Sequence, residues 1–399
     1  MNIIAAPDSF KGNMEAARVC AIIEEGALRA DGSAVVHKIP LADGGEGTAR
    51  AVTRAAGGRL VDVAVTGPLG DKTGACFGLI NGGRTAVLDM ASASGIELIG
   101  RDRLDPMKAS SYGTGELIKA ALDAGARELI IGIGGSATND GGLGMISALG
   151  FRVLDAGGGP VGQGGEALGR VERIDPSGAD PRLRGLSVKA ACDVTNPLLG
   201  PQGASAVFGP QKGAGPEMIK VLDAGLARLA GAWIRAGMAE DVERPGDGAA
   251  GGLGAALRIC LGAVMESGAL LVMKYAGFFD RLPGADLVIT GEGMTDSQTA
   301  GGKLCSVVAR ESRKAGVPVA LLSGALSGDL GELLGSFDYA VSISSGQTGL
   351  DAMIRDSPRD LGLAAENLVR ALRIGGAIAV RDRARAAAGS SQAVHSTWT

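Results

Sequence analysis

The chain has 399 residues, of which 67 are glycine and 46% are hydrophobic, but only 15 are proline and 3% are aromatic. The glycines follow no Gly-X-Y period and the apolar content suffices for a core, so a collagen-like or largely disordered chain is excluded. A formal net charge of −4 offers no basic surface to a nucleic acid or an anionic membrane, so we expect neither partner.

Short β-branched segments alternate along the chain with longer amphipathic segments. The first predicted strand covers residues 2–6, and the segment after it places Val19, Ile22, Ile23 and Ala27 at helical spacing. Further strands are predicted, in chain order, at residues 34–39, 85–90, 128–133, 286–290, 317–323 and 339–344. This alternation is typical of βαβ units, and the sequence therefore predicts an α/β fold with a mostly parallel sheet covered by helices.

Two regions interrupt the alternation. Residues 60–83 predict a pair of strands joined by a turn, and residues 151–280 carry scattered short strands and glycine-rich turns. The chain also exceeds the roughly 250 to 300 residues at which one core stops growing. We therefore expect two domains and a tail, with the larger domain formed by residues 1–60, 84–150 and 281–380, an inserted smaller domain formed by residues 61–83 and 151–280, and a polar tail at 381–399 that we expect to be disordered.

The composition also restricts the chemistry. His37 and His395 are the only histidines, which leaves little material for a histidine-rich metal site or a Ser-His-Asp triad. The five cysteines are dispersed and form no C-x-x-C pair, as expected for reduced thiols in a cytoplasmic protein. The N-terminus lacks the features of a signal peptide and no apolar run approaches 18 residues, so we expect a cytoplasmic location.

The segments that follow the predicted strands repeat one kind of chemistry. They combine carboxylates, hydroxyls, lysines and glycine-rich backbone, and they lie at residues 8–12, 41–48, 132–142 and 291–303. In an open parallel sheet, ligands bind beyond the carboxyl ends of the strands. Bare backbone N–H groups cradle phosphates, lysine neutralises a transferring phosphoryl group, and Mg²⁺ prefers one or two carboxylates plus phosphate oxygens. The pattern therefore indicates a phosphate and divalent-metal site.

Each of these side chains also has a structural explanation. Acidic residues in a glycine-rich turn are often caps, loop hydroxyls often satisfy backbone, and most lysines are exposed. Residues 132–137 formally fit the dinucleotide pattern G-x-G-x-x-A, which is weak by itself, and the chain contains no G-x-x-x-x-G-K-[ST] segment. Cys192 and Cys305 are better explained as small apolar residues than as nucleophiles.

Taken as a set, these loops resemble the type 1 glycerate kinase family. The resemblance covers about residues 1–380, and its motifs lie at residues 6–12, 42–48, 132–142, 192–198, 208–214 and 290–296. It implies an α/β protein with a Rossmann-like domain and a smaller domain facing it across a cleft. It also implies transfer of the ATP γ-phosphoryl group to a hydroxyl of D-glycerate, with O2 favoured over O3, and therefore ATP and Mg²⁺ as cofactors.

Roles for individual residues follow from their chemistry within these motifs. Asp193 is the first choice for a general base or a carboxylate next to the metal, with Lys11 and Asp8 as further catalytic residues. Asp8, Asp43 and Asp296 are the candidate Mg²⁺ ligands. The candidate substrate and phosphate-binding residues are Ser9, Asp43, Glu46, Gly134, Gly135, Ser136, Thr138, Asn139, Lys212, Glu292 and Lys303.

Two other classes of function stay open at this point. An NAD-dependent oxidoreductase rests only on residues 132–137, and Asp155 follows them across a segment that is short and glycine-rich for a βαβ helix. A non-catalytic ligand-binding protein could use the same fold, although the acidic residues and lysines of the motifs are all present. For the kinase we expect the small-molecule partners D-glycerate and ATP, and a monomer or homodimer.

Overall fold

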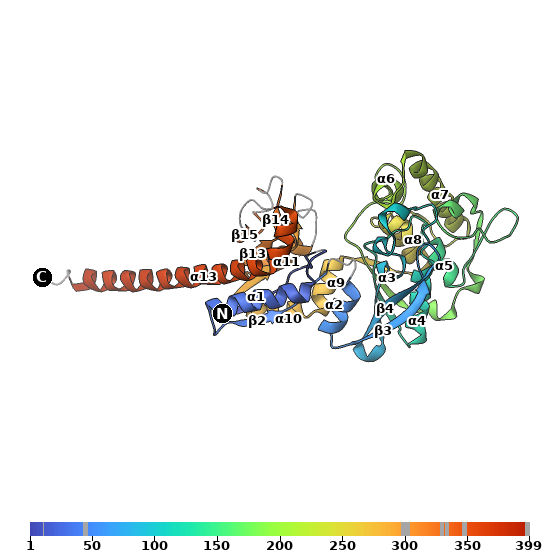
Figure 1. The fold of residues 1–399 in the computed structure, drawn as a ribbon. Helices are drawn as coiled ribbons and strands as arrows, with labels where there is room; N and C mark the ends of the chain where they lie inside the picture. The colour runs from blue at the N-terminus through green and yellow to red at the C-terminus, as the bar shows by residue number, and fades with distance from the viewer. Residues whose placement is uncertain are drawn as a thin grey trace. The chain divides into compact units, whose positions relative to one another are not determined.

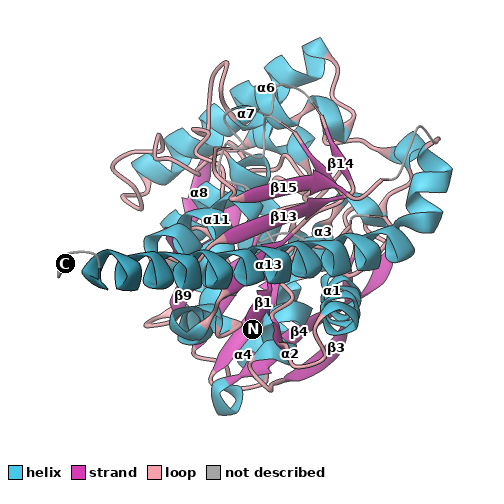
Figure 2. Ribbon diagram, turned by 90° about the vertical axis from the view of Figure 1, so that its left-hand side faces the viewer, coloured by secondary structure: helices cyan, strands magenta, loops and turns pink. Residues whose placement is uncertain are grey.

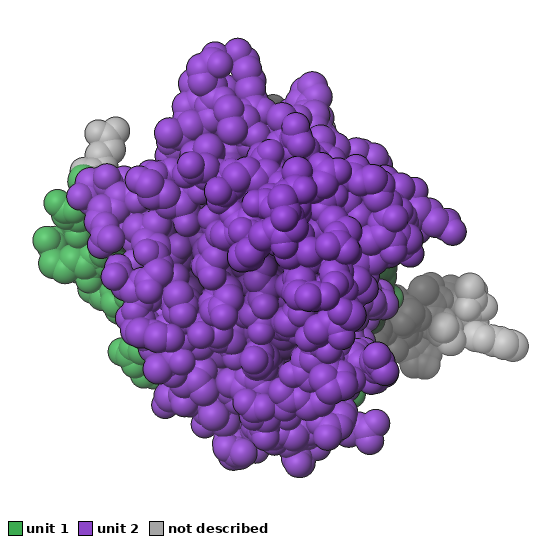
Figure 3. Space-filling view, turned by 90° about the vertical axis from the view of Figure 1, so that its right-hand side faces the viewer, with its two compact units in different colours: residues 1–40, 280–301, 308–399 green, residues 41–279, 302–307 purple. Residues whose placement is uncertain are grey.

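The computed structural model describes residues 1–10, 12–42, 47–296, 304–327, 331, 335–344 and 349–395. The chain divides into two compact units, which Figure 3 colours separately. Unit 1 comprises Met1–Pro40, Asp280–Gly301 and Val308–Thr399, and unit 2 comprises Leu41–Phe279 and Gly302–Val307. The α/β fold class predicted from the sequence is confirmed, with a parallel-sheet core in each unit.

Unit 1 is built on a five-stranded sheet in which every pair of neighbours is parallel. In spatial order the strands are β15 (Tyr339–Ser342), β13 (Val319–Ser323), β11 (Leu287–Thr290), β1 (Asn2–Ala5) and β2 (Val35–Lys38). The chain moves from β1 outward to β2 and later returns on the other side of β1 through β11. The topological switch point of this sheet therefore lies between β1 and β11, where the register pairs Ile3 with Leu287.

Helices α1 (Ala16–Ala30) and α13 (Leu350–His395) of unit 1 pack against each other (Figure 2). The first buries Val19, Cys20, Ile22 and Ile23 at the helical spacing seen in the sequence. Gly26 permits a close approach of the two helices, because a Cβ there would lie 2.4 Å from the carbonyl oxygen of Gly362. The unit also contains the short strands β12 (Met294–Thr295) and β14 (Ala325–Leu326), which pair in parallel.

Unit 2 contains a six-stranded mixed sheet, of which Figure 1 labels β4 (Lys72–Ile80) and β3 (Arg59–Thr66). Its strands in spatial order are β10 (Val264–Glu266), β9 (Ser187–Ala191), β6 (Glu128–Gly132), β5 (Thr85–Asp89), β4 (Lys72–Ile80) and β3 (Arg59–Thr66). The first four are parallel, whereas β4 runs antiparallel to both of its neighbours. The predicted pair of strands in residues 60–83 is thereby confirmed as the β3–β4 hairpin.

The helices of unit 2 surround one apolar core that includes Trp233, Phe77 and Leu117, each almost fully buried. They are α2 (Thr48–Ala55), α3 (Ala91–Ser94), α4 (Tyr112–Asp123), α5 (Leu143–Ala148), α6 (Ala204–Phe208), α7 (Pro216–Arg235), α8 (Ala249–Leu261) and α9 (Gly268–Tyr275). A small antiparallel pair is formed by β7 (Arg152–Leu154) and β8 (Arg173–Asp175). Helices α10 (Phe278–Arg281) and α11 (Leu304–Lys314) contain residues of both units.

The division of the chain differs from the one expected from the sequence. Residues 84–150 were expected in the same domain as residues 1–60 and 281–380, yet β5 and β6 pair in the sheet that contains β9 of unit 2. Alternating βα segments look alike in either sheet, and only strand pairing decides which sheet a strand joins. Residues 41–60 also belong to unit 2 rather than to the first unit.

The expected disorder of residues 381–399 differs from the structure as well. Helix α13 continues through this region to His395, while the last four residues lie outside the described part of the chain. The segment after residue 381 is rich in alanine and arginine, which are strong helix formers even without an apolar period. None of the helices formed by described residues combines the length and apolar character needed to cross a membrane.

Candidate functional site

The carboxyl edge of the unit 1 sheet brings the segments after β1 and β11 together. The N–H of Asp8 donates to the carbonyl of Gly291 at 2.8 Å, and the hydroxyl of Thr290 donates to the carbonyl of Ala6 at 2.9 Å. A side chain at Gly291 is excluded, because its Cβ would lie 2.1 Å from the carbonyl oxygen of Leu322. Two segments that are far apart in sequence thus form one edge at the switch point, which is the usual ligand-binding position of such sheets.

Asp8 and Ser9 are hydrogen-bonded to each other at this edge. Asp8 is buried, and its Oδ1 accepts from the backbone N–H of Ser9 at 2.6 Å and lies 3.4 Å from the Ser9 hydroxyl. A carboxylate held in this way is oriented in advance, as a metal or substrate ligand must be. The structure therefore brings two of the predicted residues together, whereas Lys11, predicted from the same loop, lies outside the described residues.

Glu292 joins a group of hydroxyls that the sequence did not single out. The Thr295 hydroxyl donates to Glu292 Oε1 at 2.9 Å and lies 2.9 Å from the Ser323 hydroxyl at the end of β13. The backbone of Glu292 accepts from the N–H of Gly324 at 2.9 Å. Asp296 follows Thr295 directly and is half-buried. The place of Ser323 at a strand end was an available signal, but a serine there is common and carries little information.

In unit 2, the glycine-rich segment after β6 is pinned to the segment after β5. The N–H of Ile96 donates to Gly135 at 2.9 Å, and the N–H of Ala137 donates to Ser94 at 3.0 Å. Gly135 has a φ of 75°, in the left-handed region that glycine adopts without strain. This segment, which contains the predicted residues Gly134, Gly135, Ser136, Thr138 and Asn139, is therefore a fixed part of the unit.

Lys212 reaches this segment from a 3₁₀ turn at Pro210–Lys212. Its side chain is 2% exposed, and its Nζ donates to the Ser136 hydroxyl at 2.8 Å and to the carbonyl of Thr138 at 2.6 Å. Burial lowers the pKa of Lys212 to about 7, against the opposing effect of Asp140. Residues that lie 76 positions apart in sequence, Ser136 and Lys212, are thus in direct contact.

Asp140 is a buried residue that the sequence motifs did not single out. Its carboxylate accepts from the N–H and the hydroxyl of Ser111, both at 2.8 Å, and from the N–H groups of Gly142 and Gly144, both at 3.1 Å. Burial raises the pKa of Asp140, and these four hydrogen bonds oppose the rise. Asp140 thereby joins the starts of α4 and α5 to the loop that carries Ser136.

Two buried oxygen atoms of the same loop have no hydrogen-bond partner among the described residues. They are Oγ1 of Thr138 and Oδ1 of Asn139, although the Asn139 amide nitrogen donates to Ser205 at 2.9 Å. Buried polar atoms in native proteins are nearly always paired with protein or water. The loop therefore retains hydrogen-bonding capacity beyond what the described protein groups use.

Asp193 lies two residues after the end of β9, and its position just after a strand agrees with the sequence prediction. The pairing of β9 with β6 was not expected, because these two strands were predicted in different domains. Its Oδ1 accepts from the Ser267 hydroxyl at 2.8 Å and from the N–H of Gly268 at 3.0 Å, at the start of α9. This contact gives Asp193 a structural function at a helix N-terminus, where a negative charge is favourable. Its neighbour Cys192 has a pKa that burial raises to about 11, which fits a small apolar residue and not a nucleophile.

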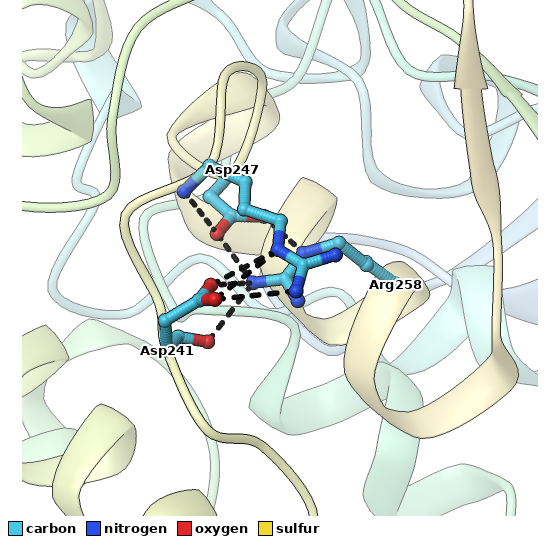
Figure 4. A network of polar contacts seen from close by, with 4 residues as sticks. Asp241, Asp247 and Arg258 are labelled. Carbon is cyan, nitrogen blue, oxygen red and sulfur yellow. Dashed lines mark hydrogen bonds and ion pairs between the residues drawn. The ribbon is translucent and has the colours of Figure 1, made fainter.

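A buried ion pair holds the segment that follows Asp193. Asp247 is fully buried and accepts from Nε and Nη2 of Arg258 at 2.8 and 2.6 Å, and Asp241 contributes further contacts (Figure 4). Next to it, the N–H of Gly248 donates to Asn196 at 3.0 Å. The pair therefore positions a loop that contacts the residues just after Asp193.

Asp89, at the end of β5, is a second acidic residue that the sequence motifs did not single out. It is buried and accepts from the N–H groups of Gly47 and Ala49 at 2.9 and 3.0 Å, at the start of α2. Its position at the end of a predicted strand was the available signal. The predicted residues Asp43, Glu46 and Lys303 lie outside the described residues.

Carboxylates suitable for a metal are present, but the described residues contain no cluster of three or more histidine, cysteine, aspartate or glutamate side chains that could hold an ion. Magnesium does not require such a cluster, since it commonly binds one or two carboxylates, substrate phosphates and water. Asp8 and Asp296 fit that donor chemistry as oxygen ligands of unit 1.

Comparison with known proteins gives a consistent result over nearly the whole chain. Residues 3–373 match the model of the glycerate kinase family. The chain is 49% identical over 329 residues to the glycerate kinase of Bacillus subtilis, covering 82% of this chain and 86% of that protein. It is 43% identical over 376 residues to the glycerate 2-kinase of Escherichia coli K12, covering 94% and 99%. A crystal structure of a candidate glycerate kinase 2 from Salmonella typhimurium LT2 superposes with a TM-score of 0.84 at 44% identity, covering 94% and 99%.

Proposed function

This chain belongs to the glycerate kinase family, and we propose that it transfers the γ-phosphoryl group of ATP to O2 of D-glycerate, giving ADP and 2-phosphoglycerate. The observation that carries the choice of O2 is the near full-length match to a relative named glycerate 2-kinase. The glycine-rich loop with its buried lysine supports phosphoryl transfer as the reaction type.

In the proposed reaction, O2 of glycerate forms a bond to the γ-phosphorus while the bond from that phosphorus to the bridging oxygen of ADP breaks. The O2 proton passes to a carboxylate, for which we propose Asp193. The contacts of Asp193 with Ser267 and Gly268 orient this carboxylate at the end of β9. Asp8 and Lys11 are proposed as further catalytic residues, acting on the charge of the transferring group.

We propose that the backbone of Gly134 and Gly135 and the side chains of Ser136, Thr138, Asn139 and Lys212 bind phosphate or carboxylate oxygens. This set has the contacts that the proposal needs, because Lys212 is already hydrogen-bonded to the loop and two buried oxygens of the loop lack described partners. Further proposed binding residues are Ser9, Asp43, Glu46, Glu292 and Lys303.

Mg²⁺ is proposed as the cation that accompanies ATP, with Asp8, Asp43 and Asp296 as its protein ligands. When bound, it would neutralise charge on the phosphate oxygens. The fixed orientation of the Asp8 carboxylate supports its place in this set. Loss of activity in the presence of EDTA, restored by Mg²⁺ in excess, is the expected result.

We also propose a cytoplasmic protein that acts as a monomer or homodimer and binds small molecules alone. Light scattering on the purified chain distinguishes the two oligomeric states, and a larger assembly would contradict the proposal.

A coupled assay that reports ADP release from Mg-ATP tests the reaction. Release that depends on D-glycerate supports the kinase function, and its absence in folded protein contradicts it. Phosphorus NMR of the product then distinguishes 2-phosphoglycerate from 3-phosphoglycerate. The second product would refute the choice of O2 while leaving the kinase function intact.

Replacement of Asp193 tests its proposed role as base. Asp193→Asn keeps the shape of the side chain but removes the proton acceptor, so kcat should fall by about 10² or more while KM for ATP changes little. Asp62→Asn, at an exposed position of β3, serves as the matched control and should leave both constants unchanged. An effect of Asp193→Asn on KM alone would reassign the residue to binding.

A further inference from the structure

Lys212 is a buried cation whose hydrogen-bonding capacity is only partly used. A protonated lysine has three N–H donors and no acceptor, and two of the donors are taken by Ser136 and Thr138. Among the described carboxylates none forms an ion pair with it, since Asp140 acts on it only at longer range. A buried charge without an ion-pair partner lowers the stability of the fold. A role of the charge in function would explain why a lysine and not a neutral side chain occupies this position.

The contact with Lys212 determines the direction of the Ser136 hydroxyl. Because the ammonium can only donate, the Ser136 oxygen must accept, and the hydroxyl proton must then point to a different acceptor. No described residue provides that acceptor. Ser136 is 7% exposed and Lys212 is 2% exposed, so both residues lie almost completely inside unit 2.

The backbone around Ser136 is held by the same set of contacts. The carbonyls of Gly135 and Thr138 accept from Ile96 and Lys212, and the N–H of Ala137 donates to Ser94. These three bonds occupy groups on both sides of Ser136 and prevent the loop from rotating as a whole. The hydroxyl is therefore a donor of fixed position, which is the property that stabilises a developing or permanent negative charge.

We propose that Lys212 is a positioning residue for the reaction: its ammonium group fixes the Ser136 hydroxyl as a hydrogen-bond donor to an anionic oxygen of the bound substrate. This inference rests on the proposed kinase function and replaces the direct binding role proposed above for Lys212: the lysine acts through Ser136 and not by its own contact with the substrate. The anionic oxygen belongs to a phosphate of ATP or to the carboxylate of glycerate, which share the required chemistry.

A purely structural role for Lys212 predicts different behaviour. A lysine that only ties the 3₁₀ turn to the loop would lower stability when removed, and its effect would not depend on whether residue 136 carries a hydroxyl. A lysine that acts through Ser136 loses its catalytic effect once that hydroxyl is absent. The two roles are therefore separated by a double-mutant cycle.

The cycle compares Lys212→Met, Ser136→Ala and the double variant in kcat, in KM for ATP and in KM for D-glycerate. Each single variant should lose about a hundredfold in kcat/KM, the usual size for removal of one oriented donor, and the double variant should lose no more than Lys212→Met alone. The control is Lys220→Met on the exposed start of α7, which should match the parent protein. Multiplication of the two single effects in the double variant would overturn the proposal.

The pH profile provides a readout that a structural role would not move. Deprotonated Lys212 can accept a hydrogen bond, so the Ser136 proton would turn inward and kcat/KM of the parent protein should fall as the pH rises above about 7. Asp140 is the titratable group that acts on Lys212, and it is held by Ser111, Gly142 and Gly144. The alkaline fall should be absent in Ser136→Ala, and a fall that persists there would overturn the proposal even if Lys212→Met does not fold.

Calorimetric titration with ATP and, separately, with D-glycerate identifies the anion and separates this inference from the proposed function. Weaker binding of ATP to both single variants assigns the Ser136 donor to a phosphate, and weaker binding of D-glycerate assigns it to the carboxylate. Unchanged Kd for both ligands together with unchanged kcat would overturn the positioning role. If the parent protein binds these ligands without glycerate-dependent ADP release, the kinase function fails while the binding result still decides the role of Lys212.

Discussion

The half-buried carboxylates of unit 1 and the buried charges of unit 2 are held in different ways. In unit 1, Glu292 and Asp296 are half-buried and Glu292 is held by the neutral hydroxyl of Thr295. In unit 2, Lys212, Asp140 and Asp247 are almost completely buried, and each is held by several hydrogen bonds. Loss of a hydrogen-bond partner should therefore lower the free energy of unfolding much more for the buried charges than for the half-buried ones, because a buried charge cannot be hydrated instead.

This difference indicates that the unit 2 loops are rigid before substrate arrives. A buried charge that lost its partners would have to be neutralised or exposed to water. Conformations without these contacts are therefore unfavourable, and the loops stay in one geometry. The half-buried groups of unit 1 can exchange hydrogen bonds with water at little cost. Substitutions that remove the partner of a buried charge should therefore lower the free energy of unfolding more than substitutions of exposed or half-buried groups.

Removal of the buried ion pair should have the largest effect. Asp247→Asn leaves Arg258 without its buried partner, and we expect the free energy of unfolding to fall by about 3 to 5 kcal/mol. Asp241→Asn changes an exposed partner of the same arginine and should cost less than about 1 kcal/mol. Urea unfolding of the two variants measures both values, and equal costs would contradict the contrast between buried and exposed groups.

The close approach of two backbones in unit 2 should give the next largest effect. Gly251 has a φ of 68°, and a Cβ there would lie 2.1 Å from the carbonyl oxygen of Thr138. Gly251→Ala therefore combines backbone strain with a clash and should cost about 3 kcal/mol, measured by thermal or urea unfolding. A cost below about 1 kcal/mol would show that the loop at Thr138 can move.

The buried lysine should make stability depend on pH. The folded-state pKa of Lys212 is lowered from 10.5 to about 7, so between these values the unfolded chain binds more protons and the free energy of unfolding rises with pH. Buried thiols such as Cys192, whose pKa is raised, contribute a slope of opposite sign at the alkaline end. The contribution of Lys212 to the slope should approach about 1.4 kcal/mol per pH unit and be lost in Lys212→Met. Urea unfolding at three pH values between these two pKa values measures it, with Lys220→Met as the variant that should keep the slope.

A glycine in the exposed part of α13 should show the smallest effect, with the opposite sign. Gly375 lies inside the helix, and a Cβ added there would meet no other atom within 4 Å, so Gly375→Ala should stabilise the helix by up to about 1 kcal/mol. The change in helical circular dichroism on heating measures it. Destabilisation would indicate that this glycine contacts another part of the chain.

Much of the fold was predictable because strand and helix periodicity is a local property. Each of the strands predicted from β-branched runs is confirmed to within one or two residues at its ends, and so is the β3–β4 hairpin. The expected division of the chain into domains differs from the structure, since β5 pairs with β6 and β6 pairs with β9, which places all three strands in the sheet of unit 2. Pairing is a long-range choice among strands of similar composition, and the local pattern contains no information about it.

For the candidate site, the sequence by itself indicated the loops that carry the chemistry, because glycine-rich segments with carboxylates and hydroxyls follow the predicted strands, and the resemblance of their motifs indicated the family. The tertiary structure decided which of those side chains meet, placing Lys212 on Ser136 and Asp193 at the start of α9. It also decided which charges are buried, such as Asp140 and Asp247. Burial depends on the packing of the whole unit around a residue, and that is the physical reason why the local sequence could not supply it.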